Sequence, residues 1–422
     1  MQSIRPPCHP PHRQPAAPAP RWSPAYTVVL LCFAAVFISY IDRTNISVAA
    51  IAMQEEFKWS ETTKGFVLSS FFVGYILLQV VSAGLANKYG GKVLLGVAVI
   101  WWSAFTMLTP VAASLGLATL IASRIALGLG EAAVFPACIN MVGRWVPAAQ
   151  RSRAVALFSS GLSIGTVFSL PVTGWLVREY GWPVPFYAFG LVGLVWAVAW
   201  FTKVSAGRGI PEEATNASRT IPWGRILRTP AVWAIIVNHF CNNWSLYVLL
   251  AWLPSYFKAT FNVSLASAGL LSAAPPLATF VMANFAGSTA DRLMRQGRSA
   301  TYVRKLMQAI GLFGCATFLL MVPLATSPGM GVFLMSSASA CLGCCLAGFA
   351  ANSFDIAPRY ADVIWGISNT FATIPGIIGV AVTGWLVQRS GSYTTAFVVT
   401  AAIAAVGGAV FMVIGSGERK IE

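Results

Sequence analysis

Charged residues are scarce in this chain of 422 amino acids, at 10% of the total, and acidic residues are the scarcer kind. Soluble globular proteins carry about 25% charged residues, so a soluble fold is excluded. Hydrophobic residues make up 57%, and the mean hydropathy is +0.70. The chain is therefore a polytopic membrane protein. Its long, continuous apolar stretches are typical of transmembrane helices and not of the alternating strands of a barrel.

Histidine is also rare, with three residues, and none of the eight cysteines is spaced with a histidine as zinc ligands are. Seven cysteines lie inside apolar stretches, where they suit packing between helices. A redox or metal site at Cys341, Cys344 and Cys345 is the alternative. We expect no metal and no cofactor, and the sequence shows no nucleophile with a base, which argues against an enzyme.

Basic residues outnumber acidic ones, 28 to 13, for a formal charge of +15. No basic run interleaved with aromatic residues forms a nucleic-acid patch, so we expect the lipid bilayer as partner and no nucleic acid. If loops alternate between two sides, the side of both termini holds 21 basic residues and the other side holds 5. The positive-inside rule then predicts both termini on the cytosolic or stromal side.

Twelve apolar spans follow one another between polar or Pro/Gly-rich breaks. They lie near residues 25–50, 64–85, 92–113, 116–141, 152–176, 184–202, 231–256, 266–290, 303–323, 329–352, 361–386 and 393–415. The longest break divides them six and six. This division predicts an all-α membrane protein of two six-helix bundles, residues 25–202 and 231–415, with a linker at 203–230 and a C-terminal tail at 416–422.

Residues 1–24 contain three arginines, eight prolines and no acidic side chain. An acid-poor, basic N-terminal segment is typical of plastid targeting, but this one is short and has few serines. A disordered tail is the other interpretation, and cleavage is left open.

The two halves of the sequence repeat each other. The letters VTGWLV occur at 172–177 and again at 382–387, an offset of 210, and a turn with Gly181 or Gly391 follows each copy. In the loops after the second and eighth spans, Asn87 corresponds to Asp291 at an offset of 204. Two similar offsets indicate parallel duplication of a six-helix unit.

Four charged residues fall in the middle of spans: Asp42 and Arg43 in the first, Arg124 and Glu131 in the fourth. Each costs about 2.5–3.5 kcal/mol at the bilayer centre, so we expect all four to face the protein interior. In the functional interpretation the arginines attract an anion, and the carboxylates are titratable groups linked to its transport. In the alternative, two ion pairs simply hold the first and fourth helices together.

Polar groups on other spans are expected to supplement these charges. The candidates for substrate contact are Tyr40, Tyr75, Tyr247 and Asn369, with packing as an equal alternative for the last three. The isolated His239 is more typical of a hydrogen-bonded packing residue than of a proton coupler. On the eleventh span, Pro375 and Gly376 predict a break in the helix that frees backbone carbonyls.

Six plus six helices in parallel repeat, with Gly and charged residues in the second and eighth loops, resemble the major facilitator superfamily. The resemblance implies a gating latch that joins an acidic side chain at a helix end to basic residues. Asn87 stands where the family usually has Asp. The latch on Asp291 and Arg292 is therefore expected to be the stronger of the two.

Four further segments narrow the resemblance: residues 40–45, 124–136, 239–244 and 355–360. They are similar to the anion:cation symporter branch, which includes vesicular glutamate transporters, sialin and the plant and algal phosphate transporter 4 family. The chain is most similar to the plant and algal group. Arg43, Arg124 and Glu131 match positions that the branch uses for anion binding and proton coupling.

This resemblance implies a secondary active transporter of inorganic phosphate or a similar small anion, coupled to H⁺ or Na⁺, monomeric and located in a plastid membrane. Vesicular glutamate transporters have an arginine where this chain has Asn242 and a histidine where it has Leu68. One fewer cavity cation disfavours glutamate. The alternatives are an organic-anion transporter of ascorbate, sialate or glutamate type, and a sensor that binds the anion without moving it.

Overall fold

The computed structural model describes residues 24–147, 150–205 and 221–421, and every regular element in these ranges is helical. Predictions for residues 1–23, for 206–220 of the linker and for Glu422 lie outside the described residues. The N-terminal bundle consists of α1 (Pro24–Phe57), α2 (Glu61–Tyr89), α3 (Gly91–Leu115), α4 (Leu117–Glu131), α5 (Val134–Trp145), α6 (Arg151–Tyr180) and α7 (Pro183–Lys203).

The second half opens with a short helix, α8 (Trp223–Arg228), before the C-terminal bundle. This bundle consists of α9 (Pro230–Phe261), α10 (Leu265–Ser272), α11 (Ala274–Arg295), α12 (Ala300–Met321), α13 (Pro328–Cys345), a π-helical turn (Leu346–Ala350), α14 (Ala351–Ile356), α15 (Ala361–Ser390) and α16 (Thr394–Ile414). Single 3₁₀ turns at Val322–Leu324 and Pro358–Tyr360 complete the connections.

Within the described ranges these helices form the twelve predicted spans, because α4–α5, α10–α11 and α13–α14 each build one span from consecutive pieces. Eleven spans are long and apolar enough to cross a membrane. The remaining span is α9, whose first half carries Asn238, His239, Asn242 and Asn243. All four side chains are buried, so α9 keeps its polar groups out of the lipid.

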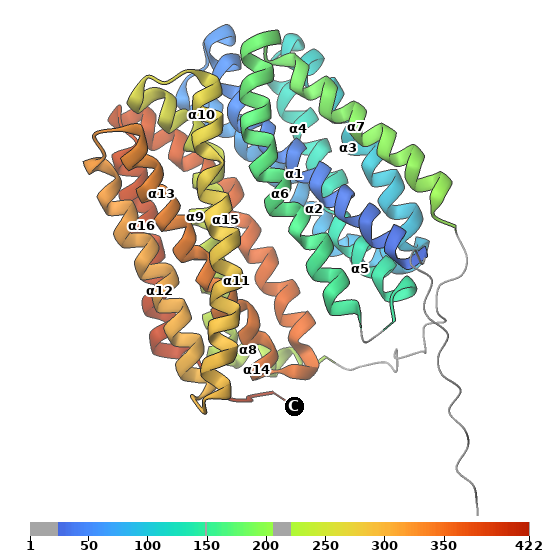
Figure 1. Cartoon of the computed structure of the whole chain (residues 1–422), viewed down its shortest axis with the longest axis vertical. Helices are drawn as coiled ribbons and strands as arrows, with labels where there is room; N and C mark the ends of the chain where they lie inside the picture. Colours follow the sequence, from blue (N-terminus) through green and yellow to red (C-terminus); the bar gives the residue numbers. More distant parts are fainter. Residues whose placement is uncertain (1–23, 148–149, 206–220, 422) are drawn as a thin grey trace, which may run out of the picture.

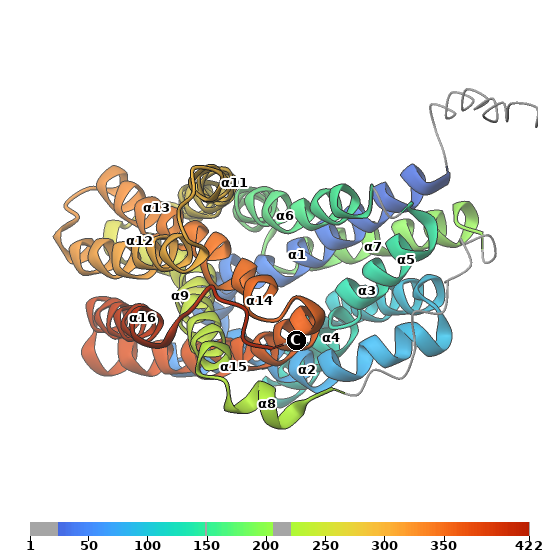
Figure 2. The same ribbon diagram turned by 90° about the horizontal axis from the view of Figure 1, so that it is seen from below.

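The two bundles lie side by side, with α1–α7 on one side and α9–α16 on the other (Figure 1, Figure 2). The described ends of the chain, the start of α1 and the tail after α16, lie on the same face of the molecule (Figure 1). An even number of spans requires this arrangement.

The repeated VTGWLV letters lie at the end of α6 and at the end of α15. In both copies a glycine at positive φ ends the helix, Gly181 at 87° and Gly391 at 68°, and its N–H donates to the carbonyl of Val177 or Val387. Glycine is required at both positions because other residues disfavour this backbone conformation. The sequence repeat is therefore also a structural repeat.

Contacts between the bundles gather on the face away from the chain ends, where α2 runs beside α15 and α6 beside α10. A β-carbon placed on Gly174 would lie 3.0 Å from the Leu265 carbonyl oxygen, and one on Gly384 would lie 2.5 Å from that of Glu61. Both glycines belong to the VTGWLV repeat. Because glycine has no side chain, the backbone of α6 approaches that of α10 at Gly174, and the backbone of α15 approaches that of α2 at Gly384.

The predicted break at Pro375 and Gly376 is wrong, because α15 continues as one helix from Ala361 to Ser390. Proline removes a single backbone donor, which a long helix held by neighbours on both sides tolerates. Gly376 has a local reason of its own: a β-carbon there would collide with the ring of Phe72 on α2.

Breaks occur instead in the fourth, eighth and tenth spans, and the fourth and tenth spans correspond in the two halves. Glu131 ends α4, and α5 resumes at Val134. In the tenth span the π-helical turn leaves backbone groups without their helical partners, and α12 supplies new ones. Gln308 accepts from the Phe349 N–H at 3.2 Å, and Arg304 donates to the Ala347 carbonyl at 2.8 Å.

Candidate functional site

All four intramembrane charges are buried, as expected from the cost of exposing them to lipid. Asp42 is 0% exposed, Arg43 8%, Arg124 1% and Glu131 1%. Asp42 and Arg43 are consecutive on α1 and must point in different directions. Arg124 and Glu131 are seven residues apart on α4 and share a face.

Arg43 forms an ion pair with Glu131 across the α1–α4 boundary. Its Nη2 lies 3.1 Å from Glu131 Oε2, and its Nε donates to the same oxygen at 3.3 Å. Ser39, one turn earlier on α1, donates its hydroxyl to that oxygen at 2.8 Å. Three donors therefore converge on one carboxylate oxygen, while Oε1 has no hydrogen-bond partner among the described residues. The Arg43–Glu131 pair therefore joins α1 to α4, which is the contact expected if these charges only hold the two helices together.

Arg124 is different, because it forms no ion pair with any described residue. Its Nε and Nη1 are buried and have no hydrogen-bond partner there. A buried guanidinium without a partner is costly, since it has lost water and gained no acceptor. Such a group is suited to bind an anion.

Aromatic rings surround the Arg43 guanidinium. Its central carbon lies 4.7 Å from the ring centroids of Tyr40, Phe71 and Tyr75, and Nη1 donates to the Tyr40 hydroxyl at 3.3 Å. Rings within about 6 Å attract a cation through their negative faces. Arg43 is thus stabilised independently of Glu131.

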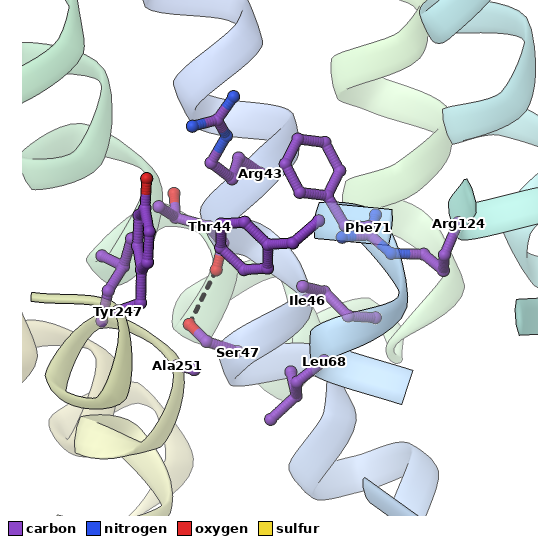
Figure 3. Close-up of a pocket in the computed structure, with 11 residues that line it drawn as sticks. Arg43, Thr44, Ile46, Ser47, Leu68, Phe71, Arg124, Tyr247 and Ala251 are labelled. Carbon is purple, nitrogen blue, oxygen red and sulfur yellow. Dashed lines mark hydrogen bonds between the residues drawn. The ribbon is translucent and has the colours of Figure 1, made fainter. Parts of the chain in front are cut away.

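A narrow cavity opens beside these residues, between the bundles (Figure 3). It is lined by Arg43, Thr44, Ile46, Ser47, Leu68, Phe71, Phe72, Arg124, Tyr247, Leu250 and Ala251. Its volume is about 20 Å³. That volume holds about one water molecule, so a larger solute requires the lining to move apart.

The C-terminal bundle reaches this cavity through α9. Tyr247 lies on the side opposite Phe71 and Arg124 (Figure 3), and its ring centroid is 4.5 Å from that of Phe72. Asn243 holds α9 in place here: its amide approaches the Tyr247 hydroxyl at 3.4 Å and donates to the Ala372 carbonyl of α15 at 3.1 Å.

Asp42 does not line the cavity. It is buried, and neither carboxylate oxygen has a hydrogen-bond partner among the described residues. The nearby Asn45, one turn along α1, is equally buried and unpartnered. Asp42 and Arg124 form no ion pair, so the second pair of the structural alternative is absent from the described residues.

Asn369 and His239 lie outside the cavity lining as well. Asn369 is half-buried on α15, and its side chain makes no hydrogen bond with a described residue. Its neighbour Ser368 contacts His239 at 3.2 Å. The His239 ring packs against Phe349 and Trp365, with centroids 4.7 and 4.9 Å away. This is the environment of a packing histidine.

The gating residues make few contacts in this structure. The Asn87 side chain accepts a long hydrogen bond from Asn140 at 3.4 Å. Asp291 and Arg292 are exposed on α11, and within the described ranges Asp291 forms no ion pair. The stronger latch at Asp291 and Arg292 stays a prediction.

A buried ion pair does occur at this end of the C-terminal bundle, between α12 and α14. Arg304 Nε donates to Asp355 Oδ2 at 2.6 Å, and Nη2 donates to Oδ1 at 3.2 Å. This bidentate geometry is strong and directional. Asp355 stands in residues 355–360, one of the segments that carried the family resemblance, but nothing in the sequence predicts that it meets Arg304.

Three functional candidates escaped the sequence analysis. Ser39 lies one helical turn before Arg43, so its position on the same face was the available signal. Phe71 had no distinguishing signal in the sequence, because aromatic residues are common in membrane helices. Lys64 is the first residue of the second predicted span, where a basic residue is expected to face water, yet it is 2% exposed and pairs with Glu61 at 2.8 Å and Gln54 at 2.7 Å.

Metal-binding groups do not gather in the described ranges, where no three His, Cys, Asp or Glu side chains could hold one ion. The seven described cysteines are free, including Cys341, Cys344 and Cys345. The arrangement offers buried cations, a carboxylate ion pair and aromatic rings between two movable bundles. Such an arrangement defines a solute carrier of the two-bundle type, with a site suited to anions.

The chain belongs to the Major Facilitator Superfamily, whose family profile matches residues 32–380. It is 40% identical, over 411 residues, to the chloroplastic sodium-dependent phosphate transport protein 1 of Arabidopsis thaliana, covering 94% of this chain and 80% of that one. It is 39% identical, over 414 residues, to the chloroplastic ascorbate transporter of the same plant, covering 94% and 76%.

A solved structure confirms the fold. A bacterial homologue of the human lysosomal transporter Spinster, in an inward-facing and occupied conformation, superposes with a TM-score of 0.77. The match covers 93% of this chain and 97% of the other, at 17% identity. At that identity the likeness concerns the fold alone.

Proposed function

We propose that this protein is a secondary active transporter that moves inorganic phosphate by alternating access, coupled to H⁺ or Na⁺. The observation that carries the proposal is Arg124, a buried guanidinium that lines the cavity with Nε and Nη1 unpartnered. The Arg43 guanidinium borders the same cavity. Together they offer a small oxyanion two fork-shaped donors.

Coupling follows from competition for Arg43. In the present structure Glu131 holds Arg43, and an anion that binds Arg43 must displace that carboxylate. A buried carboxylate that loses its cationic partner takes up a proton more readily. Anion binding and protonation of Glu131 therefore favour each other, and this is the linkage that a proton symporter needs. Na⁺ as the coupling ion would serve the same charge balance, and Asp42 is the second candidate for either ion.

The proposed alternation is a rocking of the two bundles about the cavity. The present contacts close the face away from the chain ends, through Gly174 and Gly384. Opening that face separates α2 from α15 and α6 from α10. The opposite face must then close, so that the anion reaches one compartment at a time.

The relatives support phosphate and ascorbate as the leading substrates, since one is named a phosphate transport protein and the other an ascorbate transporter. Phosphate is favoured because two guanidiniums match a small tetrahedral anion. Asn242, a neutral side chain on α9, leaves the site without a third cation, which disfavours glutamate. A sialate-type substrate or a non-transporting sensor remains the alternative.

We propose a plastid membrane as the location, on the basis of the chloroplastic relatives. The excess of basic residues on the face of the chain ends supports placing that face toward the cytosol or stroma. A single polypeptide contains the whole cavity, so we propose that the monomer is the transporting unit.

Uptake of labelled phosphate into proteoliposomes tests the proposal. We expect saturable accumulation driven by a pH or Na⁺ gradient, and counterflow when the vesicles are preloaded with phosphate. Ascorbate, glutamate and sialate are added as competitors, with and without Na⁺. Accumulation of ascorbate without phosphate would reassign the substrate. Binding of phosphate without counterflow would support the sensor.

A further inference from the structure

One ring faces both cations of the site. The Arg43 guanidinium carbon lies 4.7 Å from the centroid of Phe71, and that of Arg124 lies 5.7 Å from the same centroid. Phe71 itself is 1% exposed. Figure 3 shows it coming from α2, between Arg43 on α1 and Arg124 on α4.

The backbone fixes this ring relative to α4. A β-carbon placed on Gly128 would collide with the carbonyl of Phe71, and one on Gly74 would collide with the carbonyl of Ile125. Two glycines thus bring α2 and α4 into direct backbone contact, one at Phe71 and the other one turn beyond it. Gly128 is one turn beyond Arg124, so the contact locks the ring beside that guanidinium.

Two like charges in a buried site repel each other unless something holds both. The Phe71 ring attracts each guanidinium without belonging to either as a counter-ion. Its attraction therefore persists when Arg43 exchanges Glu131 for another partner. The rings of Tyr40 and Tyr75 contact Arg43. Of these three rings, Phe71 is the one that Arg124 also faces.

We infer that Phe71 is a positioning residue that holds the guanidiniums of Arg43 and Arg124 in place beside the cavity that both line, so that one small oxyanion can reach both. The inference rests on the proposed function and deepens it by naming what holds the two donors in place. Phe71 touches the cations and acts on the anion through them.

The test is equilibrium binding of labelled phosphate to the purified, detergent-solubilised full-length protein. We expect Phe71→Leu to weaken phosphate affinity about tenfold, because the contacts to both guanidiniums are lost. Phe71→Tyr keeps the ring face and should stay within about threefold of wild type. Phe158→Leu, which removes an equally buried ring remote from the cavity, is the matched control and should bind normally.

A double-mutant cycle separates positioning from general packing. Lysine stacks on rings less well than arginine, so in an Arg124→Lys background the effect of Phe71→Leu should shrink at least about threefold. The inference would be overturned if Phe71→Leu weakened phosphate affinity by the same factor in the wild-type and Arg124→Lys backgrounds. Equal losses of phosphate affinity in Phe71→Leu and Phe158→Leu would also overturn it. Should Phe71→Leu not elute as a single folded species, Phe71→Met takes its place in the cycle.

Failure of the inference is distinct from failure of the proposed function. If wild type binds phosphate and the cycle shows no coupling, the positioning role falls and the phosphate site stands. If wild type binds no phosphate, the proposed substrate falls. The same cycle is then measured with ascorbate, because the contacts between ring and guanidiniums do not depend on the anion.

Discussion

The two halves of the molecule arose from one six-helix unit, yet they contribute different chemistry to the cavity between them. The N-terminal bundle supplies both guanidiniums, and one of them is paired with Glu131 of the same bundle, whereas the C-terminal bundle supplies Tyr247, Leu250 and Ala251. Its own buried arginine, Arg304, is tied to Asp355 and braces a helix instead. Charge chemistry and shape can therefore change independently, one in each half.

Removal of the unpartnered cation should have the largest effect. We expect Arg124→Ala to weaken phosphate affinity about a hundredfold, since the site loses a charge-assisted donor from a buried position. Competition binding measures the loss. Arg153→Ala, an exposed arginine of the same bundle, should bind as wild type. A modest loss in Arg124→Ala would move the anion site away from the N-terminal half.

The two buried arginine–carboxylate pairs allow a direct comparison of the halves. We expect Glu131→Gln to reduce gradient-driven phosphate accumulation more than about tenfold, because no proton is then linked to anion binding at Arg43. Phosphate exchange across the membrane should stay within about threefold of wild type, because Arg43 is free to bind the anion. Asp355→Asn breaks the corresponding kind of pair in the C-terminal half and should keep accumulation coupled. Full accumulation in Glu131→Gln would show that the coupling group lies elsewhere.

The repeated glycines test the closed face. We expect Gly384→Val to raise the labelling rate of a cysteine at Thr62 by a membrane-impermeant maleimide about fivefold, because a side chain 2.5 Å from the Glu61 carbonyl forces the bundles apart. Gly174→Val, with 3.0 Å available, should raise it less. Gly366→Val on the same helix as Gly384 has open space around it and should leave labelling unchanged.

The smallest effect is expected from giving the C-terminal half a charge of its own. We expect Asn242→Arg to shift preference from phosphate toward glutamate by about threefold, because an added cation favours a dicarboxylate but its burial opposes the gain. Competition uptake measures the ratio. Asn242→Gln enlarges the side chain without charge and should not shift it. Equal shifts in both variants would point to shape and not to charge.

Much of this arrangement could be predicted from residue types. Hydropathy located the twelve spans, and the energetic cost of charge in lipid placed Asp42, Arg43, Arg124 and Glu131 in the interior. The pairing of Arg43 with Glu131 is one of the two ion pairs of the structural alternative, and the second pair, between Asp42 and Arg124, does not form among the described residues. Which of the two pairs forms depends on how α1 and α4 pack, and sequence alone does not give that. Arg124 and Glu131 share a face, but shared faces do not specify partners.

Other errors have equally local causes. Pro375 reads as a helix breaker in sequence, yet neighbouring helices keep α15 continuous. The breaks at Glu131 and at Leu346–Ala350 have only weak signals, Pro136 just beyond the first and Gly348 inside the second. Sequence alone does not separate these positions from Pro375, because neighbouring helices decide whether a helix continues. Lys64 has the sequence position of a surface residue at the start of a span, but in the structure it is paired with Glu61 and Gln54.

The π-helical turn of the tenth span has a consequence for aligning the two repeats. Such a turn accommodates one additional residue, and each residue advances a helix by about 100°, so side chains beyond it point in a new direction. Asp355 faces Arg304 in this rotated register. The repeat offset is 204 at Asn87 and Asp291, before the turn, and 210 at the VTGWLV copies, beyond it. No constant offset therefore aligns the two halves across the tenth span, and the additional residue of the turn contributes to the difference.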